Sequence, residues 1–130
     1  MTRPMLRRRA ANTPAIIVVG EASPLTDFLY AQLRQQECSI ITALLLHEVL
    51  RLLARRPIPL VVCDDSTSSM RNFALMSEIK QRSPQTHVVL VVPSGSPDQE
   101  RRARAAGADS YISSTFALKR LQPLLAAVLS

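Results

Sequence analysis

The sequence is poor in the residues that build several common kinds of functional site. It has two cysteines and three glycines in 130 residues. No apolar run approaches the ~20 residues that a membrane-spanning helix needs. Cys38 and Cys63 are isolated, with no CxxC pair and no histidine at metal-ligand spacing, so we expect buried, reduced thiols. Gly95 stands alone between two serines, which is far short of a glycine-rich phosphate-binding loop.

What the chain has in excess is positive charge, concentrated at its start. Sixteen Lys and Arg against ten Asp and Glu give a net charge of +6, and Arg3 and Arg7 to Arg9 precede any periodic pattern. We therefore expect a flexible basic arm over residues 1–14 and one folded domain over residues 15–130. The rest of the chain is mildly basic, so nucleic acid binding by this domain alone is not expected. The apolar run AIIVVG is too short for a signal peptide, and we expect a cytoplasmic protein.

Short apolar segments alternate with helical patterns five times along the chain. Apolar and β-branched runs predict strands at Ile16–Val19, Cys38–Thr42, Leu60–Cys63, His87–Val92 and Tyr111–Ile112. Each run is followed by apolar residues at helical spacing, and Pro123 is expected to kink the last helix. Strict alternation with short connections favours right-handed crossovers and a mainly parallel sheet. The sequence therefore predicts one α/β domain, a doubly wound three-layer sandwich.

Carboxylates follow two of the predicted strands at their C-terminal ends. Glu21 comes directly after AIIVVG, and Asp64 and Asp65 come directly after LVVC. Open parallel α/β sheets bind ligands in the crevice outside these ends. We therefore expect an acidic site made of Glu21, Asp64 and Asp65, with Glu21 and Asp64 as the candidate metal ligands.

From Ala15 to Leu129 the chain resembles the receiver domain of bacterial response regulators. The segments that carry the match are VVGEAS, LVVCDDS, RARAAGADSYI and SSTF. The resemblance implies a CheY-like, flavodoxin-like sandwich of five helices and a five-stranded parallel sheet in the order 2-1-3-4-5. It also implies two-component phosphorelay signalling, in which a histidine kinase phosphorylates the aspartate at the position of Asp64. In that chemistry a divalent cation such as Mg²⁺ and a lysine neutralise the phosphoryl charge.

Several positions depart from the pattern of that family. Gly20 stands where the family has the first acid of a pair, and Val92 where it has a hydroxyl that contacts the phosphoryl group. Ser114 stands at the position of the lysine. Tyr111 matches the family's rotating aromatic, but without a hydroxyl at Val92 we expect a half-buried, structural tyrosine with its hydroxyl in water. These departures predict a degenerate pseudo-receiver that is not regularly phosphorylated and binds Mg²⁺ weakly or not at all.

We expect a bacterial signalling domain that works through protein–protein contacts. It is not expected to be an enzyme, because no nucleophile with its base can be identified. Two alternatives are open: a receiver that accepts phosphate on Asp64, and the N-terminal regulatory module of a DNA-binding transcription regulator. The resemblance implies a protein partner or a homodimer at the face of the fourth helix, fifth strand and fifth helix, where the candidate residues are Arg101, Arg102, Arg104, Tyr111 and Phe116. A continuous apolar patch at Leu44–Leu46 would favour an alternative docking surface, unless the second strand runs longer.

Overall fold

Within the part of the chain that the structure describes, five strands alternate with five helices. The structure is a computed structural model that describes residues 14–20, 24–33, 38–65, 71–113 and 117–129. The strands are β1 (Ala15–Val19), β2 (Ser39–Ala43), β3 (Leu60–Asp64), β4 (His87–Val92) and β5 (Ser110–Ser113). The helices are α2 (Pro24–Leu33), α3 (Leu46–Arg55), α4 (Arg71–Arg82), α5 (Pro97–Ala105) and α6 (Ala117–Leu129). None of the described helices has the length and apolar character needed to cross a membrane.

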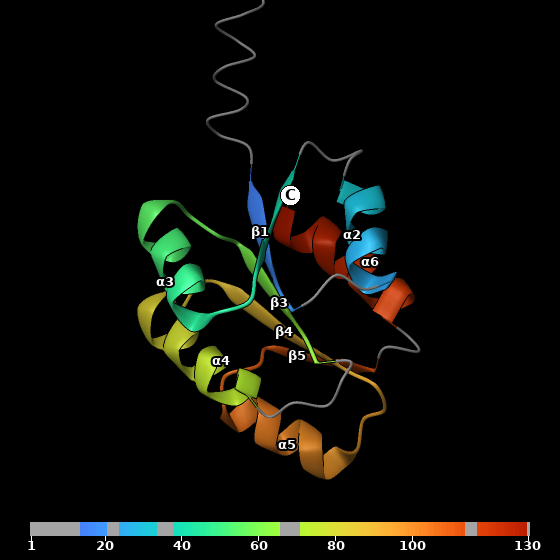
Figure 1. The fold of residues 1–130 in the computed structure, drawn as a ribbon. Helices are drawn as coiled ribbons and strands as arrows, with labels where there is room; N and C mark the ends of the chain where they lie inside the picture. The colour runs from blue at the N-terminus through green and yellow to red at the C-terminus, as the bar shows by residue number, and fades with distance from the viewer. Residues whose placement is uncertain (1–13, 21–23, 34–37, 66–70, 114–116, 130) are drawn as a thin grey trace, which may run out of the picture.

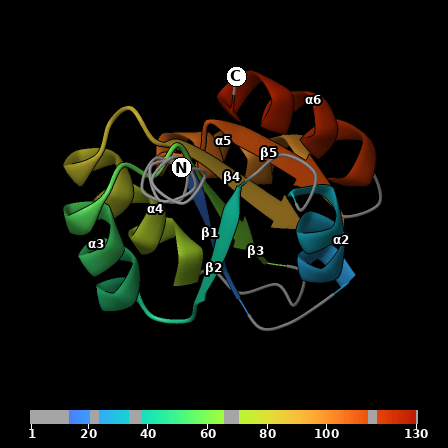
Figure 2. The same cartoon turned by 90° about the horizontal axis from the view of Figure 1, so that it is seen from above.

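The strands form one parallel sheet with the order β2-β1-β3-β4-β5. Helices α3, α4 and α5 cover one face of the sheet, and α2 and α6 cover the other (Figures 1 and 2). This arrangement confirms the predicted three-layer, flavodoxin-like sandwich. The direction of winding reverses between β1 and β3, so the C-terminal ends of these two strands flank the crevice where such sheets bind ligands.

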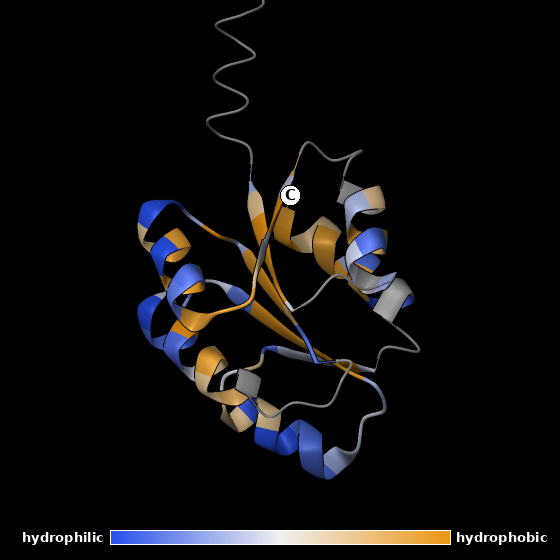
Figure 3. Cartoon of the chain, in the orientation of Figure 1, coloured by the Kyte–Doolittle hydropathy of each residue, from blue (hydrophilic) through white to orange (hydrophobic). Residues whose placement is uncertain are grey.

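The central strands are apolar on both faces and therefore build two cores. Successive side chains of a strand point to opposite sides. Ile17 and Val61 accordingly pack under α3, α4 and α5, whereas Ile16 and Val62 pack under α2 and α6. Figure 3 shows that the strands are largely hydrophobic, whereas α5 is largely hydrophilic. Polar chemistry is thereby confined to the helix surfaces and the two ends of the sheet.

The main difference in strand boundaries lies at the edge strand β2. This strand begins at Ser39, so Cys38 precedes it and is partly exposed. The expectation of a buried thiol is therefore wrong for Cys38, because an edge strand has a neighbour on one side alone and its ends reach solvent. Cys63 lies in the buried strand β3 and is fully buried, as expected.

The local signals for helix ends are confirmed where the structure describes them. The Ser96 hydroxyl accepts a hydrogen bond from the Gln99 N–H at 3.1 Å, and Pro97 occupies the first turn of α5. Gly107 follows α5 with a φ of +119°, the left-handed conformation that favours glycine. Helix α6 continues through Pro123 to Leu129.

Asp109, the last residue of the segment AGAD before β5, belongs to a polar network. Lys80 on α4 donates hydrogen bonds to the carbonyls of Pro84 and Thr86 and to the Asp109 carboxylate, which lies 2.9 Å from Nζ. The Val88 N–H also donates to Asp109, at 2.8 Å. Asp109 thus ties α4, β4 and the start of β5 together at the end of the sheet opposite to the candidate site.

His87 belongs to the same end of the molecule and has a partner that the sequence did not suggest. Its Nε2 lies 2.8 Å from the Ser110 hydroxyl on the neighbouring strand. Burial lowers the pKa of His87, although the nearby Asp109 charge raises it in part and Lys80 lowers it further. Burial by itself would raise the pKa of Asp109, but the hydrogen bonds from Lys80 and Val88 outweigh it and the net shift is downward.

Both shifts predict that acid destabilises the domain. A lowered histidine pKa means that the unfolded chain binds the proton more readily, so the contribution of His87 is lost as the pH falls below the ordinary value of 6.5. The contribution of Asp109 is lost further down, below its ordinary value of 3.8. We expect the thermal midpoint to fall in two steps on acidification. In His87→Gln the decrease of the melting temperature at the higher pH should be smaller, and in Asp109→Asn the decrease at the lower pH should be smaller. Melting temperatures recorded over a series of pH values measure both effects. Unaltered profiles in both variants would contradict this assignment.

Candidate functional site

The C-terminal ends of β1 and β3 bring two of the predicted site positions together. Val19 pairs with Cys63 across the two strands, which places Gly20 beside Asp64. Asp64 is partly exposed at this edge, whereas the neighbouring Asp65 is buried with 7% of its surface exposed. Glu21, the other predicted acid, lies outside the described residues.

Gly20 adopts a backbone conformation that other residues rarely take. Its φ is +141°, and its N–H donates a hydrogen bond to the Ala43 carbonyl at 3.0 Å. A Cβ atom at this position would lie 3.2 Å from both the Cβ and the carbonyl oxygen of Asp64. An acidic residue at position 20 would therefore also require a different backbone conformation, because the observed one favours glycine.

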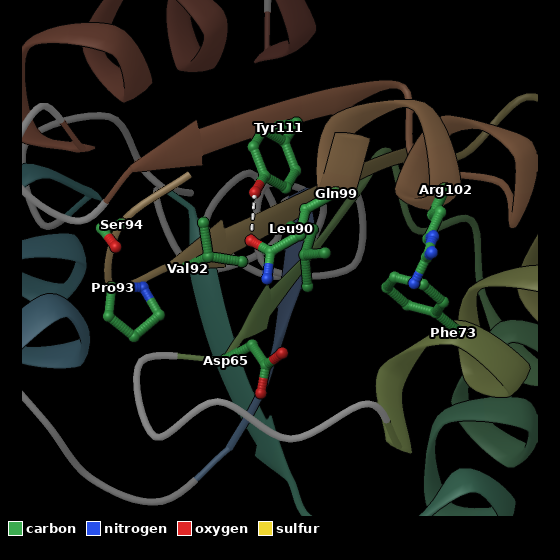
Figure 4. Close-up of a pocket in the computed structure, with 9 residues that line it drawn as sticks. All are labelled: Asp65, Phe73, Leu90, Val92, Pro93, Ser94, Gln99, Arg102 and Tyr111. Carbon is green, nitrogen blue, oxygen red and sulfur yellow. Dashed lines mark hydrogen bonds between the residues drawn. The ribbon is translucent and has the colours of Figure 1, made fainter. Parts of the chain in front are cut away.

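Asp65 turns toward a hollow of about 590 Å³ between α4 and α5. Figure 4 shows Phe73 and Arg102 on one side of this hollow and Pro93 and Ser94 on the opposite side. The Asp65 N–H donates to the Val91 carbonyl at 2.7 Å, which holds the start of the following loop against β4. The two adjacent aspartates thus have different surroundings, because Asp64 is partly exposed at the C-terminal end of β3 whereas Asp65 is buried.

Cys63 precedes the two aspartates but does not add a nucleophile to the site. Burial, and secondarily the charge of Asp65, raises the pKa of its thiol to about 12. Since the thiolate is the reactive form, a thiol with this pKa is inert near neutral pH.

Tyr111 and Val92, the positions that the resemblance assigns to a switch, belong to one apolar core. Both are buried and belong to the core under α3, α4 and α5. The Tyr111 hydroxyl donates a hydrogen bond to Gln99 Oε1 at 3.0 Å (Figure 4) and accepts one from the Ser96 N–H at 3.4 Å. The expectation of a half-buried ring with its hydroxyl in water is wrong, because α5 supplies partners that the sequence pattern did not reveal.

The ring of Tyr111 fits beside α5 because Gly95 has no side chain. A Cβ atom on Gly95 would come 2.7 Å from Tyr111 Cε1 and 3.1 Å from its hydroxyl oxygen. Neither Gly95 nor Gln99 was predicted as a site residue. The one signal in the sequence was a lone glycine directly before the Ser-Pro start of a helix.

The metal ion that the resemblance implies does not fit the described part of the site. Gly20 offers no side-chain oxygen, and its φ of +141° disfavours any residue that would. Among the described residues, no group of three or more histidine, cysteine, aspartate or glutamate side chains is close enough to hold a metal. Asp64 is thus the described member of the predicted Glu21 and Asp64 pair, and Ser114 lies outside the described residues.

The predicted interface residues of α5 are exposed but already paired within their own helix. Arg101 and Arg102 lie 3.1 and 3.4 Å from the Asp98 carboxylate, and Arg104 lies 3.0 Å from Glu100. Tyr111 is buried, with 8% exposed, so little of its ring is left for a partner to contact. Phe116 lies outside the described residues.

The leucines of the alternative docking surface are exposed, because β2 ends at Ala43. Leu44, Leu45 and Leu46 have 63%, 54% and 38% of their surface exposed. The Glu48 carboxylate accepts hydrogen bonds from the N–H groups of Leu44 and Leu45, at 3.2 and 3.0 Å, which fixes this turn at the start of α3. The leucines lie beyond the end of β2, far along the sheet from α5 and α6.

Comparison with known proteins agrees with the geometry. Residues 16–126 match the family described as the response regulator receiver domain. The response regulator protein PilR of Pseudomonas aeruginosa is 29% identical over 113 residues, which are 87% of this chain and 25% of PilR. The chain thus spans about a quarter of the length of that relative.

Solved structures share the fold over most of the chain. A response regulator from Thermotoga maritima superposes with a TM-score of 0.76 and 25% identity, over 90% of this chain and 98% of that one. An atypical orphan response regulator, described as having a phosphorylation-independent regulatory mechanism, superposes with a TM-score of 0.72 and 20% identity, over 88% and 94% of the two chains. At 20% identity this second likeness concerns the fold alone.

Proposed function

Given that the chain belongs to the response regulator receiver domain family, we propose that it is a cytoplasmic signalling module of a bacterium that acts through protein contacts, without regular phosphorylation of Asp64. Receiver domains are in general signalling modules and not enzymes, and they interact with histidine kinases or other proteins. The proposal concerns how this member works. We propose that its partner contacts lie on the face of α5, β5 and α6.

The conformation of Gly20 carries the proposal. Phosphoryl transfer to a carboxylate requires cations that neutralise the charge of the attacking and the transferred groups. A cation held beside Asp64 needs carboxylate ligands, and at Gly20 the first ligand is replaced by a residue whose φ of +141° disfavours any side chain. The C-terminal ends of β1 and β3 accordingly lack a carboxylate ligand that a metal-assisted phosphoryl transfer to Asp64 needs.

The contacts of Tyr111 support the same conclusion. A phosphorylation switch needs a second state in which a hydroxyl and the aromatic ring rearrange together. Val92 has no hydroxyl, and the Tyr111 hydroxyl is already bonded to Gln99 and to the Ser96 N–H. One arrangement of this face is therefore favoured whether or not a phosphodonor is present.

Treatment with a phosphodonor tests the proposal. After incubation with acetyl phosphate and Mg²⁺, we expect intact-mass spectrometry to show no adduct of one phosphoryl group, and the melting temperature to be unaffected by Mg²⁺. A receiver domain with the complete acid pair and lysine serves as the positive control. A stoichiometric adduct that disappears in Asp64→Asn would overturn the proposal and favour the phosphorylated receiver.

A further inference from the structure

Three consecutive leucines lie exposed in the turn between β2 and α3. We call Leu44, Leu45 and Leu46 the leucine turn; with Tyr30 on α2 they are the large hydrophobic residues that the described part of the chain exposes. Strand β2 is an edge strand of the sheet, so the leucine turn and α3 lie at the periphery of the molecule (Figures 1 and 3). Single exposed leucines are ordinary on a protein surface, but a run of three is an apolar patch that indicates a binding surface.

The backbone of the leucine turn is hydrogen-bonded within the turn itself. The N–H groups of Leu44 and Leu45 both donate to the Glu48 carboxylate, and the Leu45 carbonyl accepts from the N–H groups of Glu48 and Val49 at 3.1 and 3.3 Å. Transfer of an unpaired backbone group into an apolar medium costs several kcal/mol. The leucine turn can therefore enter such a medium with these groups already paired.

Positive charge lies along the side of α3 that continues from the leucine turn. His47, Arg51 and Arg55 recur at intervals of four residues, so they lie along one side of the helix, and all three are exposed. Among the described residues, neither Arg51 nor Arg55 has a side-chain ion pair or hydrogen bond. Glu48, the one acid of α3, is bound to the backbone of the leucine turn. The outer side of α3 thus complements an anionic surface.

We propose that the leucine turn inserts into the surface of a membrane that contains anionic lipids, with the outer side of α3 lying on the headgroups. The leucines reach the boundary between headgroups and acyl chains, and Arg51 and Arg55 pair with lipid phosphates. Binding of this kind increases with the buried apolar area and with the attraction of cations to anionic lipids. It is separate from the partner contacts proposed on the face of α5, β5 and α6.

A bilayer suits the leucine turn better than a protein surface does. Consecutive side chains of a turn project in different directions, so a rigid partner would need a separate pocket for each leucine, whereas fluid lipid adapts to their shape. A second copy of this chain fits less well, because two leucine turns in contact would bring Arg51 and Arg55 of one copy close to those of the other.

Tryptophan fluorescence tests insertion at the leucine turn. The chain has no tryptophan, so Leu45→Trp introduces a single indole there. With vesicles of phosphatidylcholine and phosphatidylglycerol we expect a blue shift of its emission and quenching by brominated acyl chains. Tyr30→Trp is the matched control, because position 30 is 42% exposed on the other face of the sheet and its emission should not shift. The basic arm attracts both variants to the vesicles alike, so a difference between them reports insertion.

Vesicle co-sedimentation of the full chain measures the two contributions. L44S/L45S and R51Q/R55Q should each lower the partition coefficient about tenfold, and salt should weaken the binding. K119Q/R120Q removes the same charge from α6 and should bind nearly like the native protein. Melting temperatures should be retained in L44S/L45S, because both side chains are exposed and serine is favoured at the N-cap position of Leu45.

Four results would overturn the inference. The first is an unshifted emission of Leu45→Trp, or an equal shift in Tyr30→Trp. The second is equal loss of binding in R51Q/R55Q and K119Q/R120Q, which would indicate a general charge effect. The third is a blue shift of Leu45→Trp with an acidic helical peptide but not with vesicles, which would indicate a protein partner. The fourth is a dimer, seen by sedimentation, that L44S/L45S abolishes.

Discussion

Replacing Gly20 with aspartate is expected to destabilise the domain and not to create a magnesium site. The substitution restores the family's acid in sequence, but it places an L-residue at a φ of +141° with its Cβ 3.2 Å from Asp64. Backbone strain of this kind costs about 1–3 kcal/mol, and a new carboxylate beside Asp64 adds repulsion. We expect the melting temperature to fall on the order of 5–10 °C. Thermal denaturation with and without Mg²⁺ measures both effects.

Gly20→Ala separates the strain from the charge. It should lose most of the same stability with no response to Mg²⁺, and Gly20→Asp should lose somewhat more. If Mg²⁺ instead raises the melting temperature of Gly20→Asp above that of Gly20→Ala, the backbone adapts and the argument from the conformation of Gly20 is wrong.

Replacing Gly95 with alanine is expected to expel the ring of Tyr111 from its site. The new methyl group would lie 2.7 Å from Tyr111 Cε1, so the ring must move and its hydroxyl must leave Gln99. The lost burial and hydrogen bond together amount to about 1–3 kcal/mol of stability. Tyr111 lines both the hollow beside Asp65 and a second hollow between α5 and α6, so displacement of its ring changes the shape of both.

Tyrosine fluorescence measures this displacement directly. The chain has no tryptophan and two tyrosines, so Tyr30→Phe leaves Tyr111 as the one tyrosine emitter. In that background, we expect acrylamide to quench the Gly95→Ala variant severalfold more strongly than the parent. Ser94→Ala is the matched control, because it changes the exposed neighbour without adding a Cβ near the ring. Unchanged quenching in Gly95→Ala would show that Gly95 does not govern the ring.

The fold was predictable because its signals are local. Runs such as HVVLVV are apolar on both faces, a pattern that suits strands covered by helices on both sides, and Ser96-Pro97 and Gly107 mark helix ends by backbone geometry that few other residues satisfy. The edge strand β2 was less well predicted, since its half-exposed residues follow no strict pattern and Cys38 fell outside it. The partner of His87 was missed because Ser110 is distant in sequence and adjacent in the sheet.

The candidate site was predictable in position and less so in geometry. The predicted strand ends located Asp64 and Asp65 at one end of the sheet. The sequence also showed that Gly20 has no carboxylate at the position where the family has one. The burial of Asp65 and the hydrogen bond between Tyr111 and Gln99 depended on how α4 and α5 pack. The ion pairs of the α5 arginines are instead local, because their partners lie three or four residues earlier in the same helix.

By itself, the sequence determined the order of elements and the parallel sheet, because both follow from side-chain chemistry and from neighbours along the chain. The tertiary structure alone decided the conformation of Gly20, the burial of the ring of Tyr111 and the hollow between α5 and α6. These features arise where segments distant in sequence meet. Their free energies depend on distances between atoms of different elements, and no pattern along one segment encodes such distances.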